Sequence, residues 1–294
     1  MQLPSTPLPL RIITHNIRYA TTSPFRGEEP WSTRLPLLIS QLHYLTSAPP
    51  STSPTIICLQ EVLHPQLSDI LTTLNSTLPS HLHWSSIGVH RDDGHLAGEA
   101  SPILYQPHYL HPETNTTTWL SPTPSTPSKG WDAASIRIVT HGIFTHLPTS
   151  KKLAILSTHL DDQGPISRLH ASEILLTLTS QYSPLPIILA GDFNSEVTQE
   201  AYIHLTRKSS GIIDIKPHTP NIYGEENTYT GFGYEDEPQK QIDFIFINDS
   251  IATNPDSPPK NWKITGYAVM PNKFNDIGVF VSDHRPVIAD LELL

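Results

Sequence analysis

Several apolar stretches of the sequence end in a polar side chain of a type that can do chemistry. The clearest is ILAGDFNSE (188–196), in which the apolar run stops at Gly191 and is followed by Asp192 and Asn194. Because successive side chains of an extended chain alternate between its two sides, Asp192 and Asn194 are predicted to point the same way. Gly, Asp and Asn are also common turn residues, so this stretch alone leaves a plain turn as an equal alternative.

The same arrangement recurs along the chain, with a polar group directly after or directly before an apolar run. The residues concerned are Asn16, Glu61, His159, Asp243, Asp283 and His284. Burying a charged group is costly unless it is paired or bound to a metal, so this many positions are difficult to explain as separate turns. If these ends converge, they form a pocket rich in carboxylate, amide and imidazole groups.

This combination of groups suits phosphoester hydrolysis with a divalent cation. Mg²⁺ and Mn²⁺ prefer oxygen ligands, often one or two carboxylates with water and a substrate phosphate. Phosphoryl transfer needs a metal, a positioned water molecule and donors for the negative charge on the phosphate. A thiolate zinc site is excluded because the chain has one cysteine, Cys58, which is predicted to be a core residue. The residues do not distinguish Mg²⁺ from Mn²⁺.

Strands and helices are predicted to alternate around these positions. Strands are predicted at 10–17, 55–62, 84–89, 101–105, 136–147, 152–160, 186–193, 241–248, 262–269 and 284–293. Helices are predicted at 31–45 with Ser32 as N-cap, at 64–78 and at 167–182, and proline-rich loops at 47–54, 121–130 and 254–261. The interleaving in both halves favours an α/β fold in which two sheets are covered by helices.

Composition and charge narrow the class of protein. With 294 residues, 37% hydrophobic and 16% charged, the chain can bury a core. Its net charge of −10 disfavours tight binding of long nucleic acid, which usually requires a basic surface. We expect no membrane span, since no long apolar stretch occurs, and no signal peptide, which predicts an intracellular protein of the cytoplasm or nucleus.

The motifs resemble those of the endonuclease/exonuclease/phosphatase superfamily, which includes DNase I-like nucleases, apurinic endonucleases, inositol polyphosphate 5-phosphatases, neutral sphingomyelinases and poly(A) deadenylases. In chain order they are THNIRY, LQEV, STHLDD, AGDFNSE, QIDFIF and SDHRPV, from residue 14 to 287. Additional segments, among them WSTR, IGVHRDDG, GEASPILY and KGWDAASIR, are similar to a less characterised bacterial and fungal subgroup. The segment KQIDFIF departs from the tryptophan-cysteine-aspartate-arginine pattern of a 5-phosphatase.

The resemblance implies a DNase I-like α/β fold, a four-layered α/β sandwich. Two facing, mostly antiparallel β-sheets would be flanked by helices, with the active site at one edge. Because the motifs cover nearly the whole chain, we expect a single domain over residues 1–294.

The resemblance also implies roles for individual residues around a bound Mg²⁺ or Mn²⁺ ion. Asn16 and Glu61 correspond to metal-site residues, and Asp283 to a further ligand. Asp192, helped by Asn194, would orient or activate the attacking water molecule.

The phosphate itself would be held by a second group of residues. His284, oriented by Asp243, would contact the scissile phosphate, and His159 would bind it as well. Arg137 lies where relatives keep an arginine that contacts phosphate. No covalent intermediate is expected.

Substrate contacts beyond the phosphate are predicted at Glu99, Trp131 and Asp132, although core packing is the usual place for a large aromatic residue such as Trp131. Arg18 and Arg91 are not included in the predicted site. Asp161 and Asp162 are predicted to be turn or surface residues.

The function predicted from the sequence is therefore a Mg²⁺- or Mn²⁺-dependent phosphoric ester hydrolase, with a phosphodiesterase favoured. A DNA or RNA nuclease and a phosphomonoesterase remain alternatives, as does a catalytically inactive binding protein. The expected partner is a phosphoester substrate, with a nucleotide or nucleic-acid end among the options. No obligate protein partner is evident, and we expect a monomer.

Overall fold

The structure is a computed structural model that describes residues 6–47, 53–233, 236–248 and 261–294. All structural statements refer to these residues. The predicted loop 254–261 lies outside them apart from its last residue, as do residues 48–52 of the predicted loop 47–54. The predicted loop at 121–130 is confirmed, because this segment contains no helix or strand.

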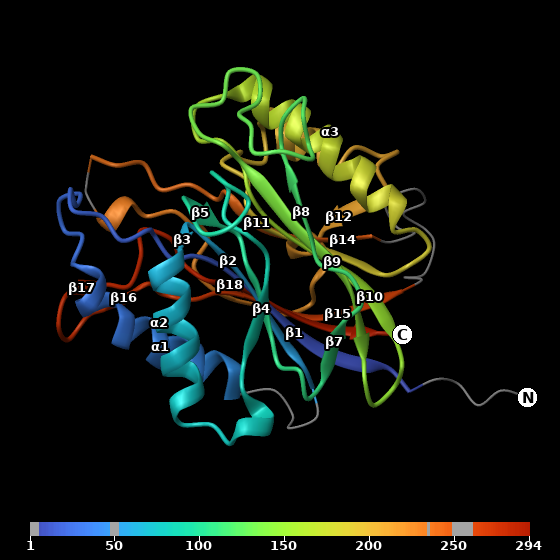
Figure 1. The fold of residues 1–294 in the computed structure, drawn as a ribbon, viewed down its shortest axis with the longest axis horizontal. Coiled ribbons are helices and arrows are strands. Elements are labelled where there is room, and N and C mark those ends of the chain that lie inside the picture. Colours follow the sequence, from blue (N-terminus) through green and yellow to red (C-terminus); the bar gives the residue numbers. More distant parts are fainter. Residues whose placement is uncertain (1–5, 48–52, 234–235, 249–260) are drawn as a thin grey trace, which may run out of the picture.

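Two large sheets form the centre of the molecule (Figure 1). The first has seven strands in the order β13-β15-β18-β1-β2-β6-β4. Their bounds are β1 (Leu8–Asn16), β2 (Thr55–Gln60), β4 (Ser85–Ile87), β6 (Ile103–Tyr105), β13 (Ile222–Gly224), β15 (Trp262–Val269) and β18 (Val287–Leu293). The pairs β1–β2 and β13–β15 are parallel, and the other pairs of this sheet are antiparallel.

The second sheet has the order β12-β14-β11-β10-β9-β7, with β8 also paired to β9. Its strands are β7 (Leu110–Pro112), β8 (Thr116–Trp119), β9 (Ile138–His146), β10 (Lys152–His159), β11 (Ile187–Asp192), β12 (Ile212–Asp214) and β14 (Asp243–Asn248). Only β10–β11 is parallel in this sheet. Two small ribbons pair β3 (Val62–Leu63) with β5 (Glu99–Ala100) and β16 (Lys273–Phe274) with β17 (Val279–Phe280).

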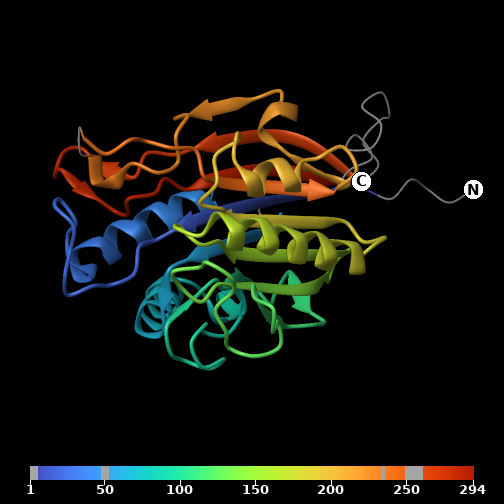
Figure 2. The same cartoon turned by 90° about the horizontal axis from the view of Figure 1, so that it is seen from above.

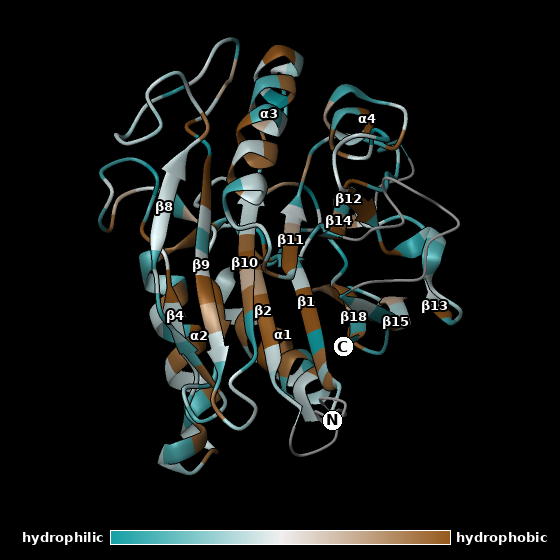
Figure 3. Cartoon of the chain, turned by 90° about the vertical axis from the view of Figure 1, so that its right-hand side faces the viewer, coloured by the Kyte–Doolittle hydropathy of each residue, from teal (hydrophilic) through white to brown (hydrophobic). Residues whose placement is uncertain are grey.

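The two large sheets face each other across one hydrophobic core. Ile12 and Ile56 from the first sheet pack with Ile155, Ile188 and Ile245 from the second, and all are fully buried. Figure 3 shows the hydrophobic colouring concentrated along these strands. Burial of this interface is the main contribution that holds the sheets together.

Helices cover the outer faces of both sheets. α1 (Trp31–Ser47) and α2 (His64–Ser76) pack on the first sheet, and α3 (Pro165–Gln181) and α4 (Glu200–Leu205) pack on the second (Figure 2). The order helix, sheet, sheet, helix confirms the predicted four-layered α/β sandwich with mostly antiparallel sheets.

The long elements lie close to their predicted positions, with differences at their ends. α1 begins at Trp31, so Ser32 is not its N-cap as predicted. α3 begins at Pro165, two residues before the predicted start, because proline is well suited to the first turn of a helix. None of the helices in the described ranges is long and apolar enough to span a membrane.

Candidate active site

The polar strand ends meet at one edge of the sandwich. In the parallel pair β1–β2, Asn16 lies beside Gln60, the residue directly before Glu61. In the parallel pair β10–β11, His159 lies beside Asp192. Asp243, the first residue of β14, lies opposite Asp192 in the antiparallel pair β11–β14. Parallel strands end at the same edge, so the two pairs bring their polar ends together.

A cavity of about 630 Å³ opens at this edge. The predicted site residues that line it are Glu61, Glu99, Arg137, His159, Asp192, Asn194, Asp283 and His284. Asn16 and Asp243 are completely buried and hydrogen-bond to side chains of this lining. The volume lies in the usual range for sites that bind small molecules.

Asp192 is the centre of the arrangement. Its Oδ2 is 2.9 Å from Asn16 Nδ2, 3.4 Å from His159 Nε2 and 3.6 Å from His284 Nε2. Its Oδ1 accepts a hydrogen bond from the backbone N–H of Asn194. Burial and the nearby charge of Asp243 raise the pKa of Asp192 to about 7. A carboxylate with that pKa is suited to accept a proton near neutral pH.

His284 is held between two carboxylates. Its Nδ1 is 2.9 Å from Asp243 Oδ2, which fixes the ring with Nε2 toward Asp192. Burial alone would lower the pKa of His284, but the charges of Asp243 and Asp192 raise it well above its usual value. The ring is therefore cationic at neutral pH and able to donate to an anion.

His15 supports His284 from behind. His15 Nε2 donates a hydrogen bond to the backbone carbonyl of His284 at 3.2 Å. Burial lowers the pKa of His15 to about 4, so this ring is neutral. His15 was not predicted as a site residue, because a fully buried histidine inside a strand has no distinct sequence signal.

His159 differs from His284 in its charge. Asn194 Nδ2 lies 3.1 Å from His159 Nε2 and also donates to the backbone carbonyl of Leu160. Burial and the positive charge of Arg137 lower the pKa of His159 well below its usual value, so it is neutral. Its Nε2 therefore accepts the hydrogen of the Asn194 amide.

Asn194 reaches the site through a turn. β11 ends at Asp192, and Asn194 has a φ of +44°, in the left-handed region. The predicted alternation of an extended strand is therefore wrong at Asn194, although both side chains do line the cavity. Asn is one of the few non-glycine residues that adopt this conformation readily.

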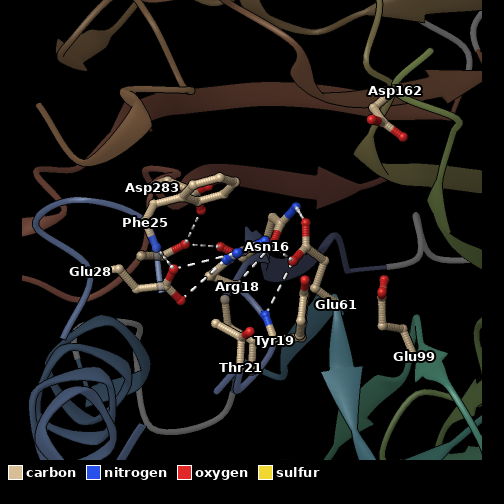
Figure 4. A network of polar contacts seen from close by, with 12 residues as sticks. Asn16, Arg18, Tyr19, Thr21, Phe25, Glu28, Glu61, Glu99, Asp162 and Asp283 are labelled. Carbon is tan, nitrogen blue, oxygen red and sulfur yellow. Dashed lines mark hydrogen bonds and ion pairs between the residues drawn. The ribbon is translucent and has the colours of Figure 1, made fainter. Parts of the chain in front are cut away.

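Asn16 and Glu61 form the opposite wall (Figure 4). Asn16 Nδ2 donates to Glu61 Oε1 at 3.0 Å, and Asn16 Oδ1 accepts the backbone N–H of Arg18 at 3.0 Å. The backbone N–H of Tyr19 donates to Glu61 Oε2 at 3.1 Å. Both carboxylate oxygens of Glu61 are thus held in place.

The charges of this wall fit a divalent cation. Burial and the neighbouring Glu61 raise the pKa of Asp283, and the same two causes raise that of Glu99 to about 7. The carboxylates of Glu61, Glu99 and Asp283 thus lie close enough to affect one another. The oxygen donors of Asn16, Glu61 and Asp283 are of the type that Mg²⁺ and Mn²⁺ prefer.

A second group of possible ligand atoms belongs to Asp192, Asp243 and His284, whose ligand atoms lie within 4.8 Å of one another. A cationic imidazole has no lone pair for a metal, and His284 Nδ1 is already bonded to Asp243. We therefore interpret this group as a hydrogen-bonded acid–base arrangement.

Charged pairs surround the outer part of the cavity. Arg91 donates to both oxygens of Glu99, at 2.8 Å each. Arg137 bonds Asp161 at 3.3 Å and Asp162 at 2.8 Å. Arg91, Glu99 and Arg137 also line one small pocket beside Glu61, so the two arginines are neighbours.

Asp161 and Asp162, predicted as turn or surface residues, have different positions. Asp161 is 1% exposed and accepts backbone N–H groups of Ala134, Ser135 and Gly164, which makes it an organiser of the turn. Asp162 lines the cavity.

Trp131 is not brought into the cavity. Its side chain is 39% exposed and stacks on His170, with the ring centroids 4.4 Å apart. The adjacent Asp132 accepts backbone N–H groups of Ile166 and Ser167 in the first turn of α3. The loop is therefore anchored on α3. Trp131 does not line the cavity, contrary to the prediction.

Several lining residues were not predicted. They include Arg18, Tyr19, Phe25, Arg91, Ser135, Arg168, Glu196, Gln199, Tyr229, Lys240 and Ile242. Arg18 lies two residues after Asn16, and Arg91 lies in the segment IGVHRDDG. Both residues therefore belong to motifs that the sequence analysis identified. The others come from loops and helix starts, where no periodic pattern indicates a position.

Comparisons with known proteins identify the family and the fold of the chain. The sequence model of the Endonuclease/Exonuclease/phosphatase family matches residues 13–284. A structure of a protein of that family from Bacteroides thetaiotaomicron superposes with a TM-score of 0.82 at 26% identity, covering 98% of this chain and 99% of that one. A mannosyl-6-phosphatase from the same organism gives a TM-score of 0.78 at 27% identity, covering 96% and 99%. An uncharacterised protein of Acanthamoeba polyphaga mimivirus is 27% identical over 196 residues, 64% of this chain and 68% of that protein.

Proposed function

The chain belongs to the endonuclease/exonuclease/phosphatase family, whose members are phosphoester hydrolases, and on this premise we propose that it is a divalent-metal-dependent hydrolase of small phosphorylated molecules. The observation that carries the proposal is the environment of Asp192. Its Oδ2 is approached by an amide and two imidazoles at the bottom of the cavity.

Asp192 acts on the attacking water in this proposal. Its raised pKa lets it accept the proton that the water loses as it attacks phosphorus. Asn194 fixes Asp192 through its backbone N–H and fixes His159 through its side chain. The water oxygen bonds phosphorus directly while the bond from phosphorus to the ester oxygen breaks, and the alcohol leaves with a proton from solvent, so no phosphorylated side chain forms.

His284 stabilises the phosphate. Its cationic ring donates from Nε2 to a phosphate oxygen, while Asp243 holds Nδ1 at 2.9 Å. The negative charge on the phosphate is thus stabilised by a hydrogen-bond donor whose direction is fixed before the substrate binds. Such pre-oriented donors stabilise a transition state most effectively. His159 Nδ1 is a second donor, because Nε2 accepts from Asn194.

Asn16, Glu61 and Asp283 would hold the metal ion in this proposal. When bound, a divalent cation supplies Lewis-acid polarisation of a phosphate oxygen. The neighbouring carboxylates whose pKa values are raised, Asp283 and Glu99, support a cation at this wall.

A phosphomonoester is favoured over the phosphodiester expected from the sequence. The mannosyl-6-phosphatase is among the similar proteins, at 27% identity over nearly the full chain. The cavity volume of about 630 Å³ suits a sugar phosphate or a molecule of similar size. The net charge of −10 counts against the nuclease alternative.

Hydrolysis of p-nitrophenyl phosphate, bis-p-nitrophenyl phosphate and mannose 6-phosphate tests the proposal. We expect release of phosphate from both monoesters with Mg²⁺ or Mn²⁺, none in EDTA, and cleavage of the diester at least about tenfold more slowly. Faster cleavage of the diester would restore the phosphodiesterase prediction. Metal binding without turnover of any phosphoester would favour the inactive binding protein.

A further inference from the structure

Arg18 is a buried arginine at the wall formed by Asn16 and Glu61. Its Nε and Nη2 bond the two carboxylate oxygens of Glu28 at 3.2 and 3.4 Å, and its Nη1 lies 3.7 Å from Glu61 Oε2 (Figure 4). The guanidinium therefore connects an interior carboxylate to one of the proposed metal ligands.

The guanidinium of Arg18 is held firmly in this place. It stacks over the rings of Tyr19 and Phe25, 4.3 and 4.6 Å from their centroids, and the side chain is only 9% exposed. The backbone carbonyl of Arg18 accepts a hydrogen bond from Arg34 at 3.1 Å. These contacts direct its charge toward Glu28 and Glu61, and they leave it little freedom to follow a substrate.

Glu28 is itself anchored in the interior. Its side chain is 2% exposed and lies 3.8 Å from the fully buried guanidinium of Arg34. Arg34 also donates to the backbone carbonyls of Ile17 and Val281. A chain of alternating charges, Arg34–Glu28–Arg18–Glu61, thus runs from the core to the cavity.

We propose that Arg18 is the resident counter-cation of the metal site. It compensates the charge of Glu61, whose Oε2 lies 3.7 Å from Arg18 Nη1, and weakens the binding of a divalent cation through charge repulsion. The proposal rests on the metal site of the proposed function. Arg18 is a positioning residue in this account, because it acts through the Glu61 carboxylate.

Titration of the protein with MnCl₂ by calorimetry tests this assignment. Arg18→Gln is expected to bind Mn²⁺ about tenfold more tightly than the wild type, because a positive charge close to the ion is removed. Glu61 keeps its bonds to Asn16 Nδ2 and the Tyr19 N–H in this variant, so its position survives. Arg18→Lys keeps the charge and is expected to restore an affinity close to that of the wild type.

Glu28→Gln shifts the affinity in the opposite direction. Without the Glu28 carboxylate, the charge of Arg18 is less compensated and repels Mn²⁺ more strongly, so binding is expected to weaken several-fold. Arg11→Gln is the matched control. It removes a two-bond pair with Asp290, at 2.7 and 2.8 Å. Arg11 lies in β1, which ends before Arg18, and does not line the cavity, so the Mn²⁺ affinity should not change.

The outcomes separate the two proposals. If the wild type binds no divalent cation, the proposed metal site is wrong and the assignment of Arg18 is lost with it. If the wild type binds Mn²⁺ but Arg18→Gln binds it equally or more weakly, only the assignment of Arg18 is overturned. Should Arg18→Gln fail to fold, Glu28→Gln decides, and unchanged or tighter binding would contradict the proposal.

Discussion

His284 lies between two carboxylates, with Nδ1 2.9 Å from Asp243 and Nε2 3.6 Å from Asp192. Asp243 is fixed in turn, since the backbone N–H groups of Ile242 and Asp243 both donate to Thr228 Oγ1. At the scale of single residues, the proposed chemistry therefore depends on a side chain, Asp243, that does not line the cavity.

Asp243→Asn tests this dependence. The amide oxygen still accepts from His284 Nδ1, but the negative charge that favours the cationic ring is lost. We expect kcat to fall by about 100-fold, the size typical for a disturbed acid–base group. Phosphate release would be measured together with a thermal melt, and a folded variant with kcat within twofold of the wild type would contradict the role of Asp243.

Residue types and their order in the chain predicted eight of the 20 residues that line the cavity. Asp192, Asn194 and His284 follow or precede long apolar strands, so the strand pattern predicted that they lie at strand ends. The prediction was wrong for Trp131 and did not include Arg168, which lines the cavity. Whether Trp131 points into a cavity or stacks on His170 depends on how its loop is anchored to α3, which no local pattern encodes.

At the scale of elements, the two parallel pairs β1–β2 and β10–β11 bring the polar strand ends to one edge. Close approach of β10 and β11 at that edge requires a glycine. Gly191 lies beside Thr158 in the pairing, and a Cβ at Gly191 would lie 2.0 Å from the Thr158 carbonyl oxygen. The glycine that directly precedes Asp192 is thus a requirement of the strand pairing.

Gly191→Ala is expected to destabilise the protein by about 2 kcal/mol or more, because the two strands must move apart to relieve the clash. Gly266→Ala in β15 is the matched control, since its Cβ would lie 3.6 Å from the nearest atom, an ordinary contact. Denaturant unfolding of both variants measures the difference. Equal stability of the two variants would show that Gly191 is not under this constraint.

Element prediction worked where a strand is long and apolar and failed where pairing alone makes a strand. Strands such as β1 and β11 are buried along most of their length. β3 and β5 have two residues each and exist because they pair with each other across a long sequence separation. α4, Glu200–Leu205, is too short to show helical periodicity.

At the scale of the whole molecule, each sheet supplies one part of the site. The first sheet and the segments that adjoin it contribute Asn16, Glu61 and Asp283, and the second contributes His159 and Asp192. The cavity exists because the two sheets share one core and end at the same edge. The family and the four-layered fold were therefore accessible from the order of the motifs, whereas the substrate depends on loops that carry no such order.

The central claim, that this cavity hydrolyses phosphoesters through Asp192, is tested most directly by one measurement. The rate of phosphate release from p-nitrophenyl phosphate in Mn²⁺ would be compared between the wild type, Asp192→Asn and Asp214→Asn. Asp214 is a suitable control because it is also a buried aspartate of the second sheet, bonded to the Tyr202 hydroxyl and outside the cavity lining. The account predicts a loss of about 1,000-fold for Asp192→Asn and a rate near that of the wild type for Asp214→Asn. A folded Asp192→Asn variant that keeps the wild-type rate would contradict it.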